Sequence, residues 1–154
     1  MHWCRAAAAA SAAAAPTCTE SQCYTPPSLT PQGVHYRESE RPPPPLRALP
    51  QGLTASTSLH ALQQLSVDWG YLDYALLSPV YDSISKPGYA AAFPHQQLAE
   101  ALHSARVPVY ALGGVTAARL PELRQLGFAG AAVLGGVWSS DDPVAALQQL
   151  QTAL

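Results

Sequence analysis

The chain has 154 residues, of which 48% are hydrophobic and 12% are charged, enough for one domain with a hydrophobic core. The formal net charge of −2 comes without any block of like charge, so nothing indicates a nucleic-acid partner. No apolar run approaches the roughly 20 residues of a membrane-spanning helix, so we expect a soluble protein with no membrane partner.

The first 31 residues differ from the rest in composition. They begin MHWCRAAAAASAAAAP, are rich in Ala, Ser, Thr and Pro, and contain Arg5 and Glu20 as their only arginine and acid. This composition fits a targeting peptide for a plastid or mitochondrion, with a disordered extension and a secretory signal as alternatives. We expect residues 1–31 to be a disordered leader and residues 32–154 to be the domain. Without a targeting function the chain would be cytoplasmic.

The predicted domain contains no cysteine, because all three lie in the first 23 residues. It therefore has neither a disulfide framework nor a thiolate zinc site.

From residue 33 onward, apolar runs alternate with stretches of helical spacing. The runs predict five strands, at residues 34–36, 53–57, 74–77, 107–112 and 129–134. Helical spacing is found in four sets of apolar residues: Leu59, Leu62, Leu65 and Trp69; Leu98, Ala101, Leu102 and Ala105; Leu120, Leu123 and Leu126; and Val144, Leu147 and Leu150. Thr116 and Asp141 or Asp142 are predicted N-caps, and Pro143 suits a first helical turn.

Strands that alternate with helices at this spacing predict right-handed βαβ units and a parallel α/β sheet. In such folds the chemistry lies at the carboxyl ends of the strands. Two successive predicted strands end in paired glycines, Gly113-Gly114 and Gly135-Gly136, each before a predicted helix. Glycines allow the backbone to approach a ligand, and helix N-termini attract phosphate. The two pairs together predict a phosphate site, whereas either pair alone would also fit a simple turn.

The segment SPVYDSISKPGY follows the predicted strand at 74–77 and contains Lys86, the only lysine of the chain. The connection is long and rich in Ser, Asp, Pro and Gly, which is unusual for a minimal connector. Two hydroxyl groups, on Ser83 and Ser85, and the ammonium of Lys86 can hold an anion. The alternative is a solvated loop in which the lysine has no role.

Five segments in order, GVHYRESE, TSLHALQQL, LDYALLSPVYDSISKPGY, VPVYALGGV and GFAGAAVLGGVW, resemble the thiamine phosphate synthase/TenI family. The resemblance covers residues 33–154 and corresponds to the C-terminal part of the family's barrel. It implies a TIM-barrel type of fold, here incomplete, with about five of the family's eight strands. The family's synthases join hydroxymethylpyrimidine diphosphate to thiazole phosphate, with Mg²⁺, and release pyrophosphate. The implied partners are therefore small phosphate esters.

The resemblance also implies roles for individual residues. Lys86 matches the lysine that grips the diphosphate, and we expect it to be the catalytic residue. Ser83 and Ser85 occupy the hydroxyl positions that hold the thiazole phosphate, and Ser58 resembles the serine that contacts the pyrimidine.

Three further matches concern phosphate and metal. Gly113 and Gly114 match phosphate-binding glycines, and Leu134-Gly135 falls where the family usually has valine and serine. Glu40 falls where the family has a magnesium-binding aspartate.

The resemblance leaves other functions open. An incomplete barrel can be a non-catalytic remnant that still binds a phosphate ester, or a TenI-like regulatory or tautomerase relative. The tautomerase branch has a catalytic histidine where this chain has Pro79, which argues against tautomerisation. A barrel with five strands also has open sheet edges, through which we expect homo-oligomers to form.

Overall fold

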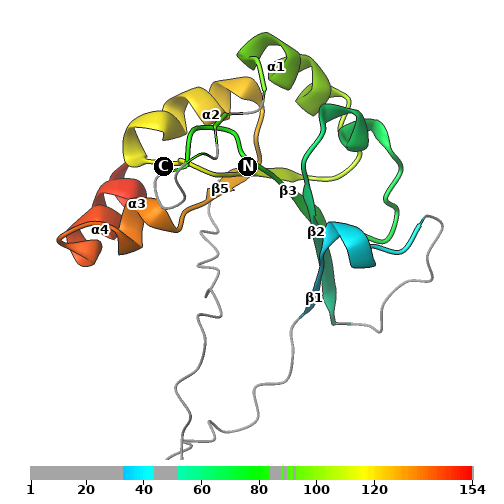
Figure 1. The fold of residues 1–154 in the computed structure, drawn as a ribbon, viewed down its shortest axis with the longest axis horizontal. Helices are drawn as coiled ribbons and strands as arrows, with labels where there is room; N and C mark the ends of the chain where they lie inside the picture. The colour runs from blue at the N-terminus through cyan, green and yellow to red at the C-terminus, as the bar shows by residue number, and fades with distance from the viewer. Residues whose placement is uncertain (1–32, 44–51, 84–87, 89, 92, 154) are drawn as a thin grey trace, which may run out of the picture.

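The computed structural model describes residues 33–43, 52–83, 88, 90–91 and 93–153. In this part of the chain, five parallel strands form one sheet whose spatial order follows the sequence (Figure 1). The strands are β1 (Gly33–Tyr36), β2 (Thr54–Leu59), β3 (Tyr74–Leu77), β4 (Val109–Leu112) and β5 (Gly130–Ala132). All five predicted strands are confirmed, with small shifts at their ends. The predicted leader, residues 1–31, lies outside the described residues.

Within the described ranges, four α-helices and three short 3-10 helices connect or follow the strands. The α-helices are α1 (His95–His103), α2 (Leu120–Leu126), α3 (Gly135–Trp138) and α4 (Pro143–Thr152). The 3-10 helices are η1 (Glu38–Glu40), η2 (Leu62–Ser66) and η3 (Ala117–Arg119). As predicted, Pro143 opens α4, and the Asp142 carboxylate caps it by accepting a hydrogen bond from the Ala145 N–H at 2.9 Å.

The helix predicted from the spacing of Leu59, Leu62, Leu65 and Trp69 is wrong. Leu59 ends β2, and only the five residues of η2 are helical. The Gln64 side-chain oxygen accepts hydrogen bonds from the N–H groups of His60 and Ala61, and the Trp69 indole N–H donates to the Gln64 carbonyl. These contacts replace helical backbone bonds, while Leu65 remains buried.

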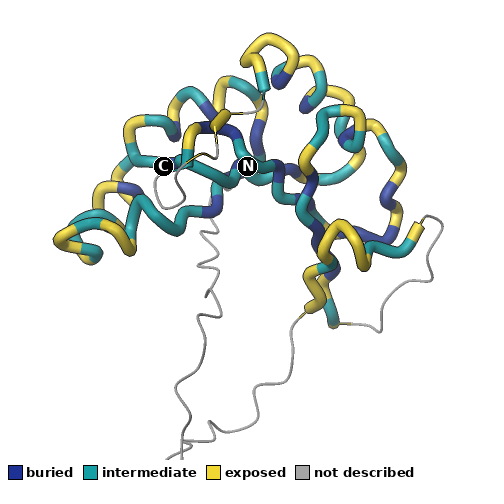
Figure 2. Tube along the Cα trace, in the orientation of Figure 1, coloured by how far each residue is buried: buried dark blue, intermediate teal, exposed yellow. Residues whose placement is uncertain are grey.

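The main core lies between one face of the sheet and the helices. Leu59, Ala75, Leu77, Val109 and Ala111 of the strands pack with Leu98 and Leu102 of α1, Leu120 and Leu123 of α2, and Leu150 of α4. In Figure 1 the helices form an arc along the convex side of the sheet. Figure 2 shows buried residues along the sheet and exposed residues on the outer turns of the helices.

The other face of the sheet carries polar and half-buried side chains. Because side chains alternate along a strand, the neighbours of the core residues point to this concave side. They include His35, Ser56, Ser58, Tyr74, Leu76, Tyr110 and Leu112. Most of these are only half-buried, and the Tyr74 and Tyr110 rings meet edge to face with centroids 5.4 Å apart. The concave face therefore combines an imidazole on β1 and hydroxyl groups on β2 with aromatic and aliphatic groups on β3 and β4.

Candidate active site

The carboxyl ends of the five parallel strands meet at one edge of the sheet. Four of these ends are followed by residues that the sequence identified as candidates: Glu40 after β1, Ser83 after β3, Gly113 and Gly114 after β4, and Leu134 and Gly135 after β5. In β2 the candidate, Ser58, lies near the end of the strand itself. The fold therefore gathers these segments, which are far apart in the sequence, along a single edge.

Hydrogen bonds to backbone carbonyls hold the ends of β2, β3 and β4 side by side. The Ser78 N–H donates to the Leu59 carbonyl at 3.1 Å, and the His60 Nδ1–H donates to the Ser78 carbonyl at 2.9 Å. Further along, the Val80 N–H donates to the Leu112 carbonyl at 3.0 Å. The start of the segment that carries Ser83 is thus fixed to the strands on both sides.

Gly113 and Gly114 lie close to the segment that follows β3. Both have positive φ angles, 94° and 63°, in the left-handed region that favours glycine. The Tyr81 N–H donates to the Gly113 carbonyl at 3.2 Å. A Cβ atom at Gly114 would overlap the backbone carbonyl of Asp82 and lie 2.8 Å from the Tyr81 Cβ. Packing between two backbones therefore gives a structural reason for the glycine pair, in addition to the predicted phosphate contact.

The second glycine pair lies against the first loop. A Cβ atom at Gly136 would lie 2.6 Å from the Val115 carbonyl oxygen, so the start of α3 contacts the loop that follows β4. The Leu134 carbonyl accepts hydrogen bonds from the N–H groups of Val137 and Trp138 in α3. The two glycine-containing loops are neighbours, as the prediction of a shared phosphate site requires.

A side-chain hydrogen bond joins two distant positions of the segment that follows β3. The Asp82 carboxylate accepts a hydrogen bond from the Ala91 N–H at 2.7 Å, which brings residues nine positions apart together. Ser83 directly follows Asp82 and is among the described residues. The predictions for Ser85 and Lys86 fall on residues outside the described part of the chain.

Ser58 takes part in a small polar network on the concave face. The His35 imidazole lies between two hydroxyl groups, with Nδ1 2.9 Å from the Ser56 Oγ and Nε2 3.1 Å from the Ser58 Oγ. Burial lowers the pKa of His35 below its ordinary value, which favours the neutral ring. A neutral ring donates from one nitrogen and accepts at the other, so His35 orients the serines rather than offering a cation to phosphate.

The acidic residues after β1 have different surroundings. The Glu38 carboxylate accepts a hydrogen bond from the Gln64 side chain at 2.9 Å and lies 3.7 Å from the Arg41 guanidinium. Arg41 also donates to the Ser58 carbonyl and stacks on Trp69, with Cζ 4.6 Å from the ring centroid. Glu40 is exposed at the end of η1. In the described part of the chain, no three His, Cys, Asp or Glu residues gather to hold a metal.

A polar cluster behind the glycine loop was not predicted from the sequence. The Tyr81 hydroxyl donates to Glu122 Oε2 at 2.7 Å, and His95 Nδ1 lies 2.9 Å from the other oxygen of the same carboxylate. The Arg119 guanidinium lies over the Tyr81 ring, with Cζ 4.3 Å from the centroid. Tyr81 and Glu122 are 41 positions apart, so no local pattern indicates their contact.

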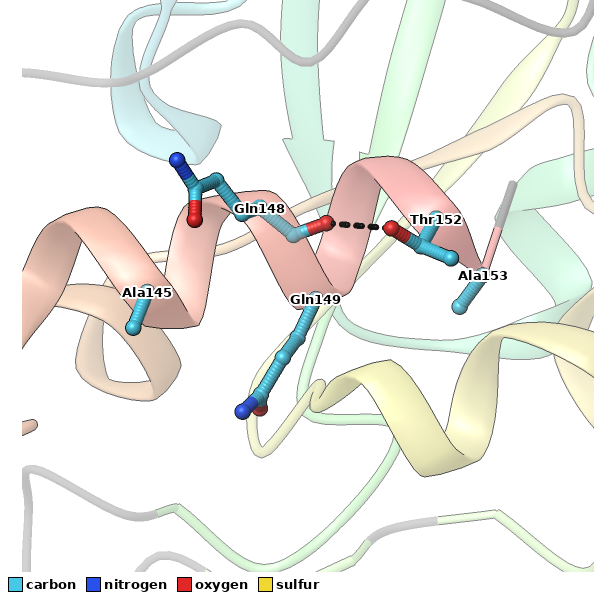
Figure 3. A pocket seen from close by; sticks show the side chains of 5 residues that line it. All are labelled: Ala145, Gln148, Gln149, Thr152 and Ala153. Atoms are coloured by element: carbon cyan, nitrogen blue, oxygen red, sulfur yellow. Dashed lines mark hydrogen bonds between the residues drawn. The ribbon is translucent and has the colours of Figure 1, made fainter.

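A hollow of about 430 Å³ lies along α4 (Figure 3). It is lined by Ala145, Gln148, Gln149, Thr152 and Ala153, and Thr152 donates a hydrogen bond to the Gln148 carbonyl. The lining contains no titratable side chain. We therefore place the candidate site at the strand ends.

None of the helices in the described ranges is long and apolar enough to cross a membrane.

Comparison with known proteins shows the family of the chain. The family model described as "Thiamine monophosphate synthase" matches residues 20–137. The chain belongs to this family. The thiamine-phosphate synthase of Synechococcus sp. (strain WH7803) is 30% identical over 125 residues, covering 77% of this chain and 34% of the relative. The synthase of Parasynechococcus marenigrum (strain WH8102) is 33% identical over 124 residues, covering 79% of this chain and 35% of the relative.

The fold is also found among solved structures. The thiamine phosphate pyrophosphorylase from Pyrococcus furiosus superposes with a TM-score of 0.61 at 22% identity, covering 79% of this chain and 58% of that one. This thiamine monophosphate synthase family member thus spans about a third of the two cyanobacterial relatives and just over half of the archaeal structure. Its five parallel strands correspond to part of a TIM barrel.

Proposed function

We propose that this chain binds the phosphate-bearing substrates of thiamine phosphate synthesis at the carboxyl edge of its sheet. In that role it takes part in joining hydroxymethylpyrimidine diphosphate to thiazole phosphate, with release of pyrophosphate. The observation that supports the proposal most strongly is the contact between the two glycine loops and the segment that carries Ser83. These three segments contain most of the residues that match the family's phosphate-binding positions.

The chemistry requires stabilisation of negative charge. When the diphosphate leaves, charge builds up on its oxygens, and a fixed cation or a set of backbone N–H groups lowers the barrier. Lys86 supplies the cation in this proposal. The hydroxyl of Ser83, that of Ser85 and the backbone around Gly113 and Gly114 bind the phosphate groups, while Ser58 contacts the pyrimidine.

Mg²⁺ enters the proposal only together with the diphosphate. The described residues contain no group of three ligands, so they do not form a site that holds the ion by themselves. Mg²⁺ in proteins is often held by one or two carboxylates and by substrate phosphates, while it keeps several waters. Glu40 is the residue of this chain that would contact such an ion, which would supply positive charge to the diphosphate.

Binding without turnover is the second candidate function. The chain spans only 34% and 35% of the two cyanobacterial synthases, and its described sheet has five strands. A chain of this extent can retain the phosphate-binding strand ends while it lacks other parts of a complete site. In that case it would bind phosphate esters but would not form thiamine phosphate.

Calorimetry on the full chain tests the proposal. Thiamine phosphate and pyrophosphate should each bind, and Mg²⁺ should strengthen the binding of pyrophosphate more than that of thiamine phosphate. Incubation with the two substrates then separates the two candidate functions, because only an active enzyme forms thiamine phosphate. If neither ligand binds with or without Mg²⁺, the proposed function is wrong.

Replacement of the single lysine should affect the two ligands differently. We expect Lys86→Ala to weaken pyrophosphate binding about tenfold or more and monophosphate binding less, because the proposed partner of the ammonium is the leaving diphosphate. Titration calorimetry of both ligands measures the difference.

Arg106→Ala is the matched control for this experiment. Arg106 is exposed and precedes β4. Its replacement therefore removes one positive charge at the amino ends of the strands, opposite the candidate site. Its affinities should stay close to those of the unmodified chain. Equal losses for both ligands in Lys86→Ala would assign the lysine to general electrostatics instead.

A further inference from the structure

The cluster of Tyr81, His95, Arg119 and Glu122 has no role in the chemistry proposed above, yet it lies directly behind the candidate phosphate loops. Its members come from four segments: the chain after β3, α1, η3 and α2. Tyr81 is buried, with 7% of its surface exposed, and its hydroxyl is held by Glu122. Burial and the adjacent Glu122 carboxylate raise the pKa of Tyr81, although Arg119 opposes this, so the phenol stays protonated and donates.

Arg119 contacts two of the three segments that the proposed function uses. Its Nη1 donates a hydrogen bond to the Gly114 carbonyl, and its guanidinium plane covers the Tyr81 ring. Tyr81 in turn donates its N–H to the Gly113 carbonyl and precedes Asp82 and Ser83. One side chain therefore connects the glycine loop after β4 with the segment after β3.

The bond to the Gly114 carbonyl also fixes a peptide orientation. In a trans peptide the C=O and the following N–H point in opposite directions. When Arg119 holds the Gly114 carbonyl, the Val115 N–H is directed away from Arg119 and from the cluster. Glycine has access to more backbone conformations than other residues, and the Arg119 contact restricts this freedom at Gly114, whose φ is 63°.

We propose that Arg119 is a positioning residue for phosphate binding: it holds the Gly113-Gly114 loop directly, and Ser83 through the ring of Tyr81, in the arrangement that receives the phosphate group. This inference rests on the proposed function. It requires arginine, because a planar guanidinium can stack on a ring while it donates an in-plane hydrogen bond, whereas a lysine ammonium cannot do both.

The test compares Arg119→Lys with Tyr81→Phe in the full chain, with thiamine phosphate as the probe. Arg119→Lys keeps the charge but loses the stacked plane, and we expect its affinity to fall about tenfold. Tyr81→Phe removes the hydroxyl bond to Glu122 but keeps the ring beneath Arg119, so its affinity should stay within about twofold. Thermal unfolding of both variants shows whether their stabilities are comparable.

Two further readouts separate positioning from other roles. The dependence of affinity on salt should be the same in Arg119→Lys and the unmodified chain, because the charge is retained. Amide hydrogen exchange at Gly113, Gly114 and Val115, measured without ligand, should be faster in Arg119→Lys and unchanged in Tyr81→Phe.

The outcomes distinguish this inference from the function on which it rests. If the unmodified chain binds thiamine phosphate and Arg119→Lys binds it equally well, the positioning role is wrong and the proposed function stands. If affinity falls in parallel with stability in both variants, Arg119 is only structural. If the unmodified chain does not bind, the proposed function and this inference are both wrong.

Discussion

Gly114→Ala should lower the free energy of unfolding by about 3 kcal/mol. Two costs combine at this position. An alanine at a φ of 63° adopts the left-handed region, which L-residues disfavour. Its Cβ would also overlap the Asp82 carbonyl, in a segment whose backbone is held to β4 and its loop through Val80 and Tyr81. Denaturant unfolding at a fixed protein concentration measures the loss.

Gly127→Ala is the matched control for this prediction. Gly127 ends α2 with a φ of 100°, but a Cβ there would meet only the Leu102 Cβ, at an ordinary distance of 3.8 Å. We expect this variant to lose about 1 kcal/mol, which is the backbone cost without the overlap. Equal losses at the two glycines would show that the close approach to Asp82 is not a constraint.

The stability effect bears on how phosphate binding at the glycine loop is tested. A bulky residue such as valine at position 114 should block approach of a phosphate to the backbone, but it would also push against Asp82 and Tyr81. Loss of thiamine phosphate affinity in Gly114→Val is therefore informative only if the variant remains folded. If a folded Gly114→Val variant keeps its affinity, Gly114 does not contact the phosphate.

The positions of the strands could be predicted because each one is a short apolar run between polar segments. The parallel order followed from the alternation with helices, and the gathering of Gly113, Gly114, Leu134 and Gly135 followed from that order. The helix expected around Leu62 and Leu65 failed because apolar spacing does not reveal the competing hydrogen bonds of the Gln64 side chain. The apolar spacing predicted a helix there, whereas local hydrogen bonds between the Gln64 side chain and the backbone limit it to the five residues of η2.

The polar contacts of the site could not be predicted from the sequence. Arg119 bonds to Gly114 only five positions away, but its stacking on Tyr81 depends on how η3 meets the segment after β3. Likewise, the pairing of His35 with Ser56 and Ser58 depends on the register between β1 and β2. Sequence patterns identify which residues have suitable chemistry, whereas register and packing decide which of them meet.

The 154-residue chain should not behave as a well-formed monomer. In the described sheet, β1 pairs only with β2 and β5 pairs only with β4, so each has one open edge. Open edges expose unpaired N–H and C=O groups, and here the concave face adds half-buried groups such as Tyr110 and Leu112. We expect self-association, pairing with a partner along these edges, or marginal stability, as measured by light scattering and native mass spectrometry at low micromolar concentration.

A lysine placed in the edge strand β1 tests whether the open edges cause self-association. Val34 in β1 is 39% exposed, and Val34→Lys should shift the chain toward the mass of a monomer, because edge lysines oppose strand pairing. Val144→Lys is the control, since Val144 is 66% exposed on α4, away from the β1 edge, and should leave the mass unchanged. If the unmodified chain is a compact monomer with cooperative two-state unfolding, the open edges are stable by themselves and this account of them is wrong.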